Sequence, residues 1–538
     1  MTVWIHRRSE DEVAAEIAAA AGPLAGLRLA VKDNVDVASV PTTAGCPDYA
    51  YTPVDDAAAV AALRAAGAVV VGKTNLDQFA TGLVGTRSPY GVVDNALRPG
   101  FVSGGSSSGS AAAVALGEAD IAIGTDTAGS GRVPAALHGI VGIKPTVGVV
   151  STAGVVPACR SYDCVTVFAA DLELAGRAMA VLAAGAPGRP WPVDTRLAAP
   201  PQPVVAVFSE LPDLDTEWRT AFDRTVAALR DRGARIAEVD PAPFLAAAKL
   251  LYGGALVAER YSAVGEFIDA HADAVDPTVG AIIRAARDIP AHQLVTDLAE
   301  LERLRALALA SLEGADVLLT PTVPGHPTIA EVAADPIGVN SRLGTYTNFC
   351  NLFDLCAVAV PAGTVGEARF GVTVLARAFE DAVAFDVAAL IAGQPDSQES
   401  AWPPEVAPVQ ELIVFGAHLR GQPLEHQLIE LGARWAGPVR TSPRYRLGAL
   451  DTIPPKPAVT RVSDGETGVS VAGERWLLSP AALGRFLAAL PAPMQLGAVE
   501  LEDGSWRTGF SAAGAAAESA KDISEYGGWR AALAAGAV

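Results

Sequence analysis

The chain has 538 residues, with 40 lysines and arginines against 60 aspartates and glutamates, so its formal net charge is −20 at pH 7. Half of the residues are hydrophobic and only 19% are charged, which supports a large core and excludes global disorder. An acidic chain without a Lys/Arg-rich run lacks the positive surface that neutralises phosphates, so we expect no nucleic-acid partner.

The sequence predicts neither export nor membrane insertion. Two N-terminal arginines are followed at once by Glu10, Asp11 and Glu12, where a signal peptide would be apolar. No apolar run of about 18 residues is free of charge or proline. The five cysteines lack CxxC spacing, which indicates reduced thiols and no zinc site. We therefore expect a cytoplasmic protein with no membrane partner.

Strand-like and helix-like stretches alternate along the first part of the chain. We expect strands over residues 27–32 and 68–72, a helix over 56–66, and a helix that Asn75 caps and that runs through Thr81. Further on, the pattern predicts a helix over 110–116, a strand over 120–125 and a helix from about Pro134. This alternation is typical of an α/β fold with a largely parallel or mixed sheet.

A linker is predicted over residues 393–409, which combine Pro, Ser, Glu and Gln without an apolar period. It separates a large domain, residues 1–392, from a smaller domain, residues 410–538.

Residues 98–146 carry the pattern with the most chemical content. Gly-Gly-Ser-Ser-Ser-Gly at 104–109 leads into a predicted helix, and Asp-Thr-Ala-Gly-Ser-Gly-Arg at 126–132 forms a second polar turn before another helix. Glycine-rich turns that open helices can bring hydroxyls and backbone N–H groups close to a ligand. Ser106 lies in the first turn and Ser130 in the second.

Three general interpretations of the first turn fit poorly. A flexible linker would not stand between ordered apolar elements, and a phosphate loop would end in Gly-Lys-Ser/Thr, which is absent. Residues 105–109 match the nucleophile-elbow pattern G-x-S-x-G, but an elbow follows an apolar strand and residues 95–100 are rich in turn formers.

The two serine turns, followed by Pro-Ala-Ala-Leu-His-Gly-Ile-Val-Gly-Ile-Lys-Pro-Thr over 134–146, resemble the amidase signature family. That family uses a Ser–Ser–Lys triad without histidine, on a large mixed sheet covered by helices. Its lysine lies in an early strand-end motif, matched here by Ala-Val-Lys-Asp-Asn at 30–34. The resemblance implies that Ser130 is the nucleophile, Ser106 the bridging serine and Lys32 the base, with no cofactor and no metal.

The chemistry agrees with these roles. A serine needs a neighbour that removes its proton, and a lysine can do so when burial depresses its pKa. A lysine at a strand end is by itself usually a surface charge, and the surrounding motif makes Lys32 the expected base. Ser107 is expected to support the loop.

The turn around Ser130 also predicts an oxyanion hole. Its expected donors are the backbone N–H groups of Thr127, Ala128, Gly129 and Ser130. Flanking this turn, the charged residues at 126 and 132 are expected to form an ion pair that braces it.

Residues 125–135, 251–260 and 340–348 resemble the allophanate hydrolase branch of the family, which implies that Tyr252 and Arg260 line the substrate site. Their spacing fits one face of a single helix, two turns apart, and a guanidinium offers a bidentate fork to a carboxylate. Two alternatives stay open: Arg260 pairs with Glu259 or another acid, and Tyr252 is a core aromatic.

Residues 415–424 and 522–529 resemble the extra domain of many allophanate hydrolases, which is similar to γ-glutamyl cyclotransferase folds, so we expect a small C-terminal α+β domain. The resemblance implies that it assists breakdown of the first product, N-carboxycarbamate. His418 and His426 are expected to be structural.

From this resemblance we expect residues 1–392 to hydrolyse allophanate (urea-1-carboxylate) to ammonia and carbon dioxide through an acyl-enzyme, in urea degradation. Another small-molecule amidase, acting on malonamate or an aryl amide, stays open, as does an A-type component of a tRNA-dependent amidotransferase complex. The expected partner is a small anionic amide; a homodimer and coupling to a urea carboxylase are also left open.

Overall fold

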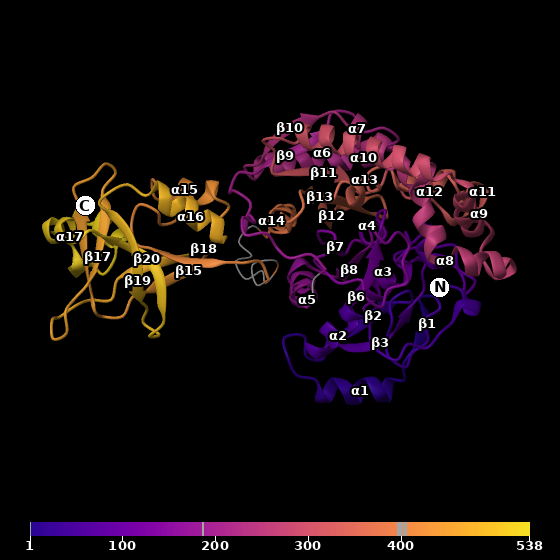
Figure 1. Ribbon diagram of the computed structural model, residues 1–538, viewed down its shortest axis with the longest axis horizontal. Helices are drawn as coiled ribbons and strands as arrows, with labels where there is room; N and C mark the ends of the chain where they lie inside the picture. The colour runs from indigo at the N-terminus through magenta and orange to yellow at the C-terminus, as the bar shows by residue number, and fades with distance from the viewer. Residues whose placement is uncertain (1, 186–187, 395–401, 403–405) are drawn as a thin grey trace. The chain divides into compact units, whose positions relative to one another are not determined.

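The computed structural model describes residues 2–185, 188–394, 402 and 406–538, and it separates into two compact units (Figure 1). The first comprises Met1–Pro190 and Pro201–Val406, and the second comprises Trp191–Pro200 and Ala407–Val538. The short segment Trp191–Pro200 therefore packs with the second unit, although the predicted boundaries place it in the first domain. Most of the predicted linker, 395–401 and 403–405, lies outside the described residues.

A large mixed sheet forms the centre of the first unit, as predicted. Its strands are β1 (Trp4–Arg7), β2 (Arg28–Lys32), β3 (Val69–Thr74), β6 (Ile121–Asp126), β7 (Val141–Lys144), β8 (Cys164–Ala169), β9 (Val204–Phe208), β10 (Arg235–Val239), β11 (Val317–Pro321), β12 (Cys356–Val365) and β13 (Ala368–Ala376). Among the described residues, the strand order is β1-β3-β2-β6-β8-β7-β12-β13-β11-β9-β10. The groups β3-β2-β6 and β11-β9-β10 are parallel, and the strands between them pair antiparallel.

Helices surround this sheet (Figure 1). They are α1 (Glu10–Ala19), α2 (Ala58–Ala65), α3 (Ser108–Ala115), α4 (Arg132–His138), α5 (Leu172–Ala184), α6 (Thr216–Asp231), α7 (Ala242–Gly253), α8 (Ala258–Ala270), α9 (Pro277–Ala285), α10 (Ala291–Ser311), α11 (Ile329–Ala334), α12 (Gly338–Leu343), α13 (Phe349–Leu352) and α14 (Asp381–Ile391). Helix α3 is buried almost along its whole length, which its alanine and glycine side chains permit. In the described part of the chain no single helix is long and apolar enough to cross a membrane, whereas the bent pair α7 with Ala255–Ala270 passes that test of length and composition.

Smaller elements connect these helices and strands. A hairpin of β4 (Asp94–Asn95) and β5 (Arg98–Val102) precedes α3. Short 3₁₀ helices lie at Pro47–Tyr49, Gln78–Ala80, Ala255–Val257, Ala272–Ala274, Ala286–Asp288 and Ser524–Tyr526.

Most predicted elements near the serine turns are present with small shifts at their ends, but the helix predicted from Asn75 through Thr81 is wrong. Only a 3₁₀ turn forms there, and Phe79 and Ala80 have φ values of 51° and 53°, which end any helix. The amide of Asn75 donates instead to the carbonyl oxygens of Thr2 and Gly91, so it holds loops together and caps no helix.

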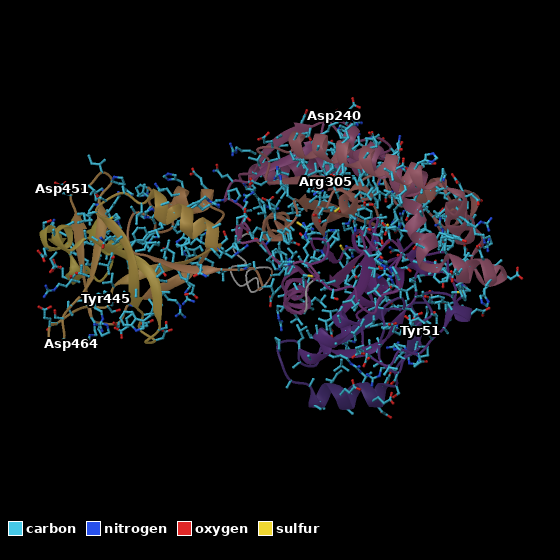
Figure 2. All side chains as sticks on the ribbon, viewed as in Figure 1. Tyr51, Asp240, Arg305, Tyr445, Asp451 and Asp464 are labelled. Carbon is cyan, nitrogen blue, oxygen red and sulfur yellow. The ribbon has the colours of Figure 1, made fainter. Side chains whose placement is uncertain are left out.

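The second unit contains small sheets and a core of its own, as expected for a separate domain. Its elements are β14 (Gln410–Val414), α15 (Glu425–Glu430), β15 (Arg434–Arg440), β16 (Tyr445–Leu450), β17 (Lys456–Arg461), β18 (Ala472–Leu478), α16 (Pro480–Ala489), β19 (Met494–Glu500), β20 (Trp506–Ala512), α17 (Gly514–Ser519), β21 (Lys521–Asp522) and α18 (Trp529–Ala534). In the described residues the sheet orders are β15-β18-β14-β20-β19 and β17-β16-β21. Phe415, Trp476 and Phe510 belong to its hydrophobic core. Figure 2 shows the side chains of both units, including Tyr51 in the first and Tyr445 in the second.

Candidate active site

Lys32, Ser106 and Ser130 meet at one edge of the large sheet. Lys32 is the last residue of β2, and Ser130 lies in the turn between β6 and α4. Because β2 and β6 are parallel neighbours, their carboxyl ends lie at the same edge. Ser106 reaches this edge from the loop between β5 and α3. The predicted triad residues therefore come together from three separate parts of the sequence.

A chain of hydrogen bonds connects the three side chains. The Lys32 Nζ atom donates to Ser106 Oγ at 2.8 Å, and the Ser106 hydroxyl donates to Ser130 Oγ at 3.0 Å. Lys32 and Ser106 are fully buried, whereas Ser130 keeps 4% of its surface exposed. The hydroxyl hydrogens can rotate, so the same contacts can carry a proton from Ser130 through Ser106 to a neutral Lys32.

Burial lowers the pKa of Lys32 to about 7, because the ammonium form loses its hydration. The carboxylates of Asp77, Asp163 and Asp126 act in the opposite direction, while the Arg260 guanidinium lowers this pKa further. A substantial fraction of Lys32 is therefore a neutral amine near pH 7, which is the form that can accept a proton.

This titration predicts that kcat/KM rises with pH through a midpoint near 7. Only the deprotonated amine of Lys32 can act as the base, so activity should be lost as the pH falls below that midpoint. Initial rates on an uncharged amide, measured from about pH 5.5 to about pH 9, would report the free enzyme alone. A rate that stays constant across this range would contradict the assignment.

The turn before α4 presents backbone donors for an oxyanion. Within the described residues, the N–H groups of Thr127, Ala128 and Ser130 have no protein acceptor. The N–H of Gly129 donates to Asp126 Oδ1 at 2.9 Å and is therefore already engaged. Three of the four predicted donors thus stay available to a developing negative charge, and Gly129 instead shapes the turn.

Gly129 has a backbone that other residues would not adopt easily. Its φ is +137°, and a Cβ atom at this position would lie 2.5 Å from Thr347 Oγ1. The approach of Thr347 therefore requires glycine immediately before the nucleophile.

The predicted ion pair of Asp126 and Arg132 is confirmed. Arg132 Nη2 lies 2.9 Å from Asp126 Oδ1, and both side chains are fully buried. The same carboxylate accepts the N–H groups of Gly129 and Gly131. Burial alone would raise the pKa of Asp126, but the Arg132 guanidinium outweighs burial and holds this pKa below its usual value. The pair fixes both sides of the nucleophile turn.

Replacing Asp126 by Asn should lower the free energy of unfolding by about 3–5 kcal/mol, because Arg132 would keep a buried charge without its counterion. Asp120→Asn, just before the other end of β6, is the matched control: its pair with Arg28 is partly exposed and should contribute under about 1 kcal/mol. Thermal unfolding of the two variants measures the difference, and equal losses would contradict a bracing role for Asp126.

Tyr252 and Arg260 contact each other, but the prediction of one shared helix is wrong. Tyr252 lies in α7 and Arg260 in α8. The helix ends because Gly254 is extended, with a ψ of −171°, and Asp297 accepts the N–H of the residue that follows. Arg260 Nη2 nevertheless donates to the Tyr252 hydroxyl at 3.2 Å, and Arg260 Nη1 donates to Thr81 Oγ1 at 3.0 Å.

Arg260 is a buried cation with neutral partners. It is 2% exposed, and it forms no ion pair with any residue that the structure describes. Glu259, the predicted alternative partner, accepts the backbone N–H of Ser161 instead. A buried guanidinium without a counterion is poised to bind an anion.

Sequence reasoning missed three residues that support the site. Thr125 Oγ1 accepts a second hydrogen bond from Lys32 at 2.8 Å, and Asp163 accepts the hydroxyl of Thr127. Asp77 accepts three backbone N–H groups of the loop that follows it. Thr125 directly precedes the second polar turn, whereas the two aspartates lie far from both turns in sequence and carry no local signal.

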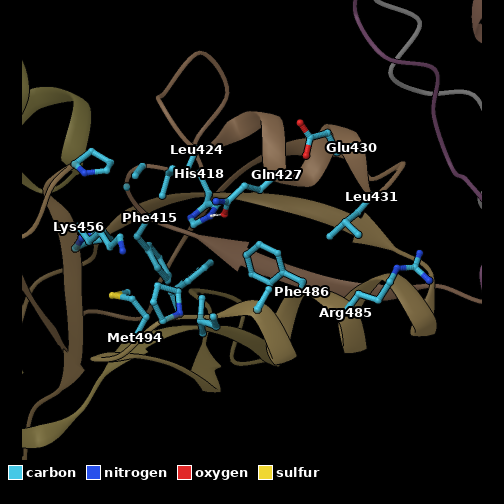
Figure 3. Close-up of a pocket in the computed structure, with 18 of the residues that line it drawn as sticks. Phe415, His418, Leu424, Gln427, Glu430, Leu431, Lys456, Arg485, Phe486 and Met494 are labelled. Atoms are coloured by element: carbon cyan, nitrogen blue, oxygen red, sulfur yellow. Dashed lines mark hydrogen bonds between the residues drawn. The ribbon is translucent and has the colours of Figure 1, made fainter. Parts of the chain in front are cut away.

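His418 lines a cavity of about 460 Å³ in the second unit (Figure 3). Its Nε2 atom lies 2.9 Å from Gln427 Oε1, and its ring stacks on Phe510 with centroids 4.9 Å apart. Burial lowers the pKa of His418, which favours the neutral imidazole. His426 is exposed and its ring contacts the Pro423 carbonyl oxygen. Nowhere among the described residues do three or more His, Cys, Asp or Glu side chains form a metal-binding group.

Two family models match the chain. The model described as Amidase matches residues 5–384, and the model described as Allophanate hydrolase C-terminal domain matches residues 410–534. The two matches fall on either side of the predicted linker.

Proteins of known name are similar over most of the chain. A urea amidolyase of Lachancea kluyveri is 41% identical over 94% of this chain, which spans only 30% of that relative. A crystal structure of Kluyveromyces lactis allophanate hydrolase has 38% identity and a TM-score of 0.89, covering 99% of this chain and 93% of that one. The A-type component of a glutamyl-tRNA(Gln) amidotransferase from Natronomonas pharaonis is 34% identical over 67% of this chain and 94% of its own.

Proposed function

The chain belongs to the amidase family, and from this premise we propose that it hydrolyses allophanate to ammonia and carbon dioxide. The observation that carries the proposal is the continuous hydrogen-bonded chain from Lys32 through Ser106 to Ser130, next to the buried, unpaired guanidinium of Arg260. The first feature supplies an amide-cleaving nucleophile, and the second supplies a receptor for the carboxylate of a small anionic amide.

The reaction begins at the terminal amide carbonyl of allophanate. Neutral Lys32 takes a proton from Ser106, Ser106 takes the proton of Ser130, and Ser130 Oγ bonds to the carbonyl carbon. The oxyanion that forms is stabilised by the free N–H groups of Thr127, Ala128 and Ser130. The proton returns along the same chain to the amide nitrogen, the C–N bond breaks, and ammonia leaves.

Water then completes the cycle. Lys32 and Ser106 remove a proton from a water molecule, which attacks the acyl-enzyme and releases N-carboxycarbamate with Ser130 restored. This dianion breaks down to a second ammonia and two molecules of carbon dioxide. We propose that the second unit, which matches the allophanate hydrolase C-terminal domain model, assists this breakdown.

Arg260→Gln tests the recognition of the carboxylate. Loss of a charge-assisted hydrogen bond costs about 1.5–3 kcal/mol, so KM for allophanate should rise about 10- to 100-fold. An uncharged amide should lose much less, because it presents no carboxylate to Arg260. Arg303→Gln, which removes an exposed arginine paired with Glu300, should leave both substrates unaffected. Equal losses on both substrates would contradict the assignment.

A comparison of substrates tests the proposed function. We expect kcat/KM for allophanate to exceed that for malonamate, biuret and an aryl amide by at least about tenfold. Higher activity on malonamate or the aryl amide would leave the mechanism intact and favour another small-molecule amidase. A gel shift with tRNA addresses the amidotransferase alternative, and tight binding would count against a small substrate.

The source of the substrate follows from its chemistry. Allophanate is urea that carries an added carboxylate, so a urea carboxylase activity must supply it. The relatives named urea amidolyase are much longer proteins, and this chain spans only about three-tenths of their length. We therefore propose that the chain works with a urea carboxylase in the cytoplasm, with a homodimer as its assembly.

A further inference from the structure

A second cavity in the first unit, of about 420 Å³, adjoins the predicted substrate residue Tyr252. Helices α7, α9, α10 and α12 contribute to its wall. Its lining residues are Arg87, Tyr252, Gly253, Gly254, Val257, Ala281, Ile282, Ala285, Ile289, Gln293, Ile337, Asn340 and Ser341. The wall is largely apolar, it includes no carboxylate among these residues, and its single formal charge is the Arg87 guanidinium.

Arg87 is buried and has donors to spare. It is 3% exposed, and it forms no ion pair with any described residue. Its Nη1 atom donates to the Thr81 carbonyl oxygen at 2.9 Å and its Nη2 atom to the Pro336 carbonyl oxygen. The buried Nε atom has no hydrogen-bond partner. An unsatisfied buried guanidinium of this kind is costly unless it serves an anion.

The cavity is continuous in chemistry with the Arg260 site. Thr81 connects the two guanidiniums, since its carbonyl oxygen accepts from Arg87 and its hydroxyl accepts from Arg260. Tyr252 also belongs to both places, because it lines the cavity and its hydroxyl accepts from Arg260. Arg260 in turn lies close enough to Lys32 to lower its pKa.

We propose that this cavity is an entry chamber in which Arg87 binds the carboxylate of a small anionic amide before Arg260 receives it. The inference rests on the proposed function and adds a second anion subsite to it. A chain with a net charge of −20 repels anions at long range, so a local cation on the approach raises the rate of capture. The apolar wall lowers the local dielectric and strengthens the attraction to Arg87. Asn340 engages its Oδ1 with the Leu83 N–H, which leaves its amide N–H₂ group to support the same anion.

Charge substitutions at Ala285 test the chamber without touching the contacts of Arg87. Ala285 is exposed, ends α9 and lines the cavity. Ala285→Glu should raise KM for malonamate and allophanate about tenfold, whereas Ala285→Lys should leave it unchanged or lower it. Neither variant should change kcat by more than about twofold, and neither should affect kcat/KM for an uncharged amide.

Arg87 itself is tested with two variants. Arg87→Gln should raise KM for anionic amides at least about tenfold and weaken the salt dependence of kcat/KM, while Arg87→Lys should keep most of that salt dependence. Thermal unfolding identifies any variant that fails to fold, in which case the Ala285 pair decides.

Three outcomes overturn the inference: equal effects of Glu and Lys at position 285, equal losses on charged and uncharged amides, or no dependence on either position. Failure of the proposed function looks different, because wild-type enzyme would then hydrolyse uncharged amides but not anionic ones.

Discussion

Replacing Ser130 by Ala should reduce ammonia release from allophanate by at least about 10⁴-fold, because no other hydroxyl can form the acyl-enzyme. The Ser130 side chain lies at the outer end of the chain from Lys32 and is the triad member with measurable exposure to an incoming substrate. The loss should appear in kcat, while malonate, a dicarboxylate without an amide, should still bind the variant. Ammonia release at saturating allophanate measures the first effect, and calorimetry measures the second.

Ser108→Ala is the matched control for this experiment. Ser108 opens α3, close to Ser106 in the same loop, and its buried Oγ has no hydrogen-bond partner. Its removal should therefore change kcat by no more than about threefold. If Ser130→Ala retained more than about one-hundredth of wild-type activity, a different nucleophile would have to be sought.

Replacing Lys32 by Met should lower kcat about 10³-fold or more, since a general base of this kind contributes about 10²–10⁴-fold. Methionine has a similar length and is apolar, so it fills the buried position without a charge and without a proton acceptor. KM should change little, because Lys32 contacts Ser106 and Thr125 and reaches the substrate only through the serines.

The exposed lysine of α7 supplies the comparison for Lys32. Lys249→Met removes a positive charge at the surface and should retain wild-type kcat and the rise of activity through pH 7. In Lys32→Met, the remaining activity should lose that rise. An unchanged pH profile in Lys32→Met would show that another group titrates there.

The triad could be predicted from sequence because each member lies in a compact local motif. The two polar turns contain Ser106 and Ser130, and a buried apolar strand ends at Lys32. The order of strand, turn and helix then decides which edge of the sheet these residues share. The mixed sheet likewise followed from apolar stretches that alternate with alanine-rich helices.

Other features depend on contacts that no local pattern records. Asn75 is a good helix cap by type, yet its amide binds Thr2 and Gly91 and the chain turns into a left-handed conformation at Phe79. The spacing of Tyr252 and Arg260 suits one helix, but Asp297, a residue of α10, captures the backbone where α7 ends. In both cases a residue distant in sequence decides between two locally reasonable conformations.

His418 and Arg87 illustrate the same limit for sites. His418 has no motif partner in sequence, and its place on a cavity wall depends on Gln427, Phe510 and the packing of the second unit. Arg87 lies in a loop whose shape is fixed by the buried carboxylate of Asp77. Burial and the absence of a counterion, rather than residue type, make Arg87 noticeable.

Isotope labelling of the substrate tests the central claim most directly. Allophanate labelled with ¹⁵N at its terminal amide is mixed with excess enzyme, and the ammonia released in a single turnover is analysed over time. Attack of Ser130 on the terminal carbonyl predicts that the first ammonia carries the label and that the internal nitrogen follows without it. Release of unlabelled ammonia first, or labelled ammonia at the same rate from Ser130→Ala, would contradict the account.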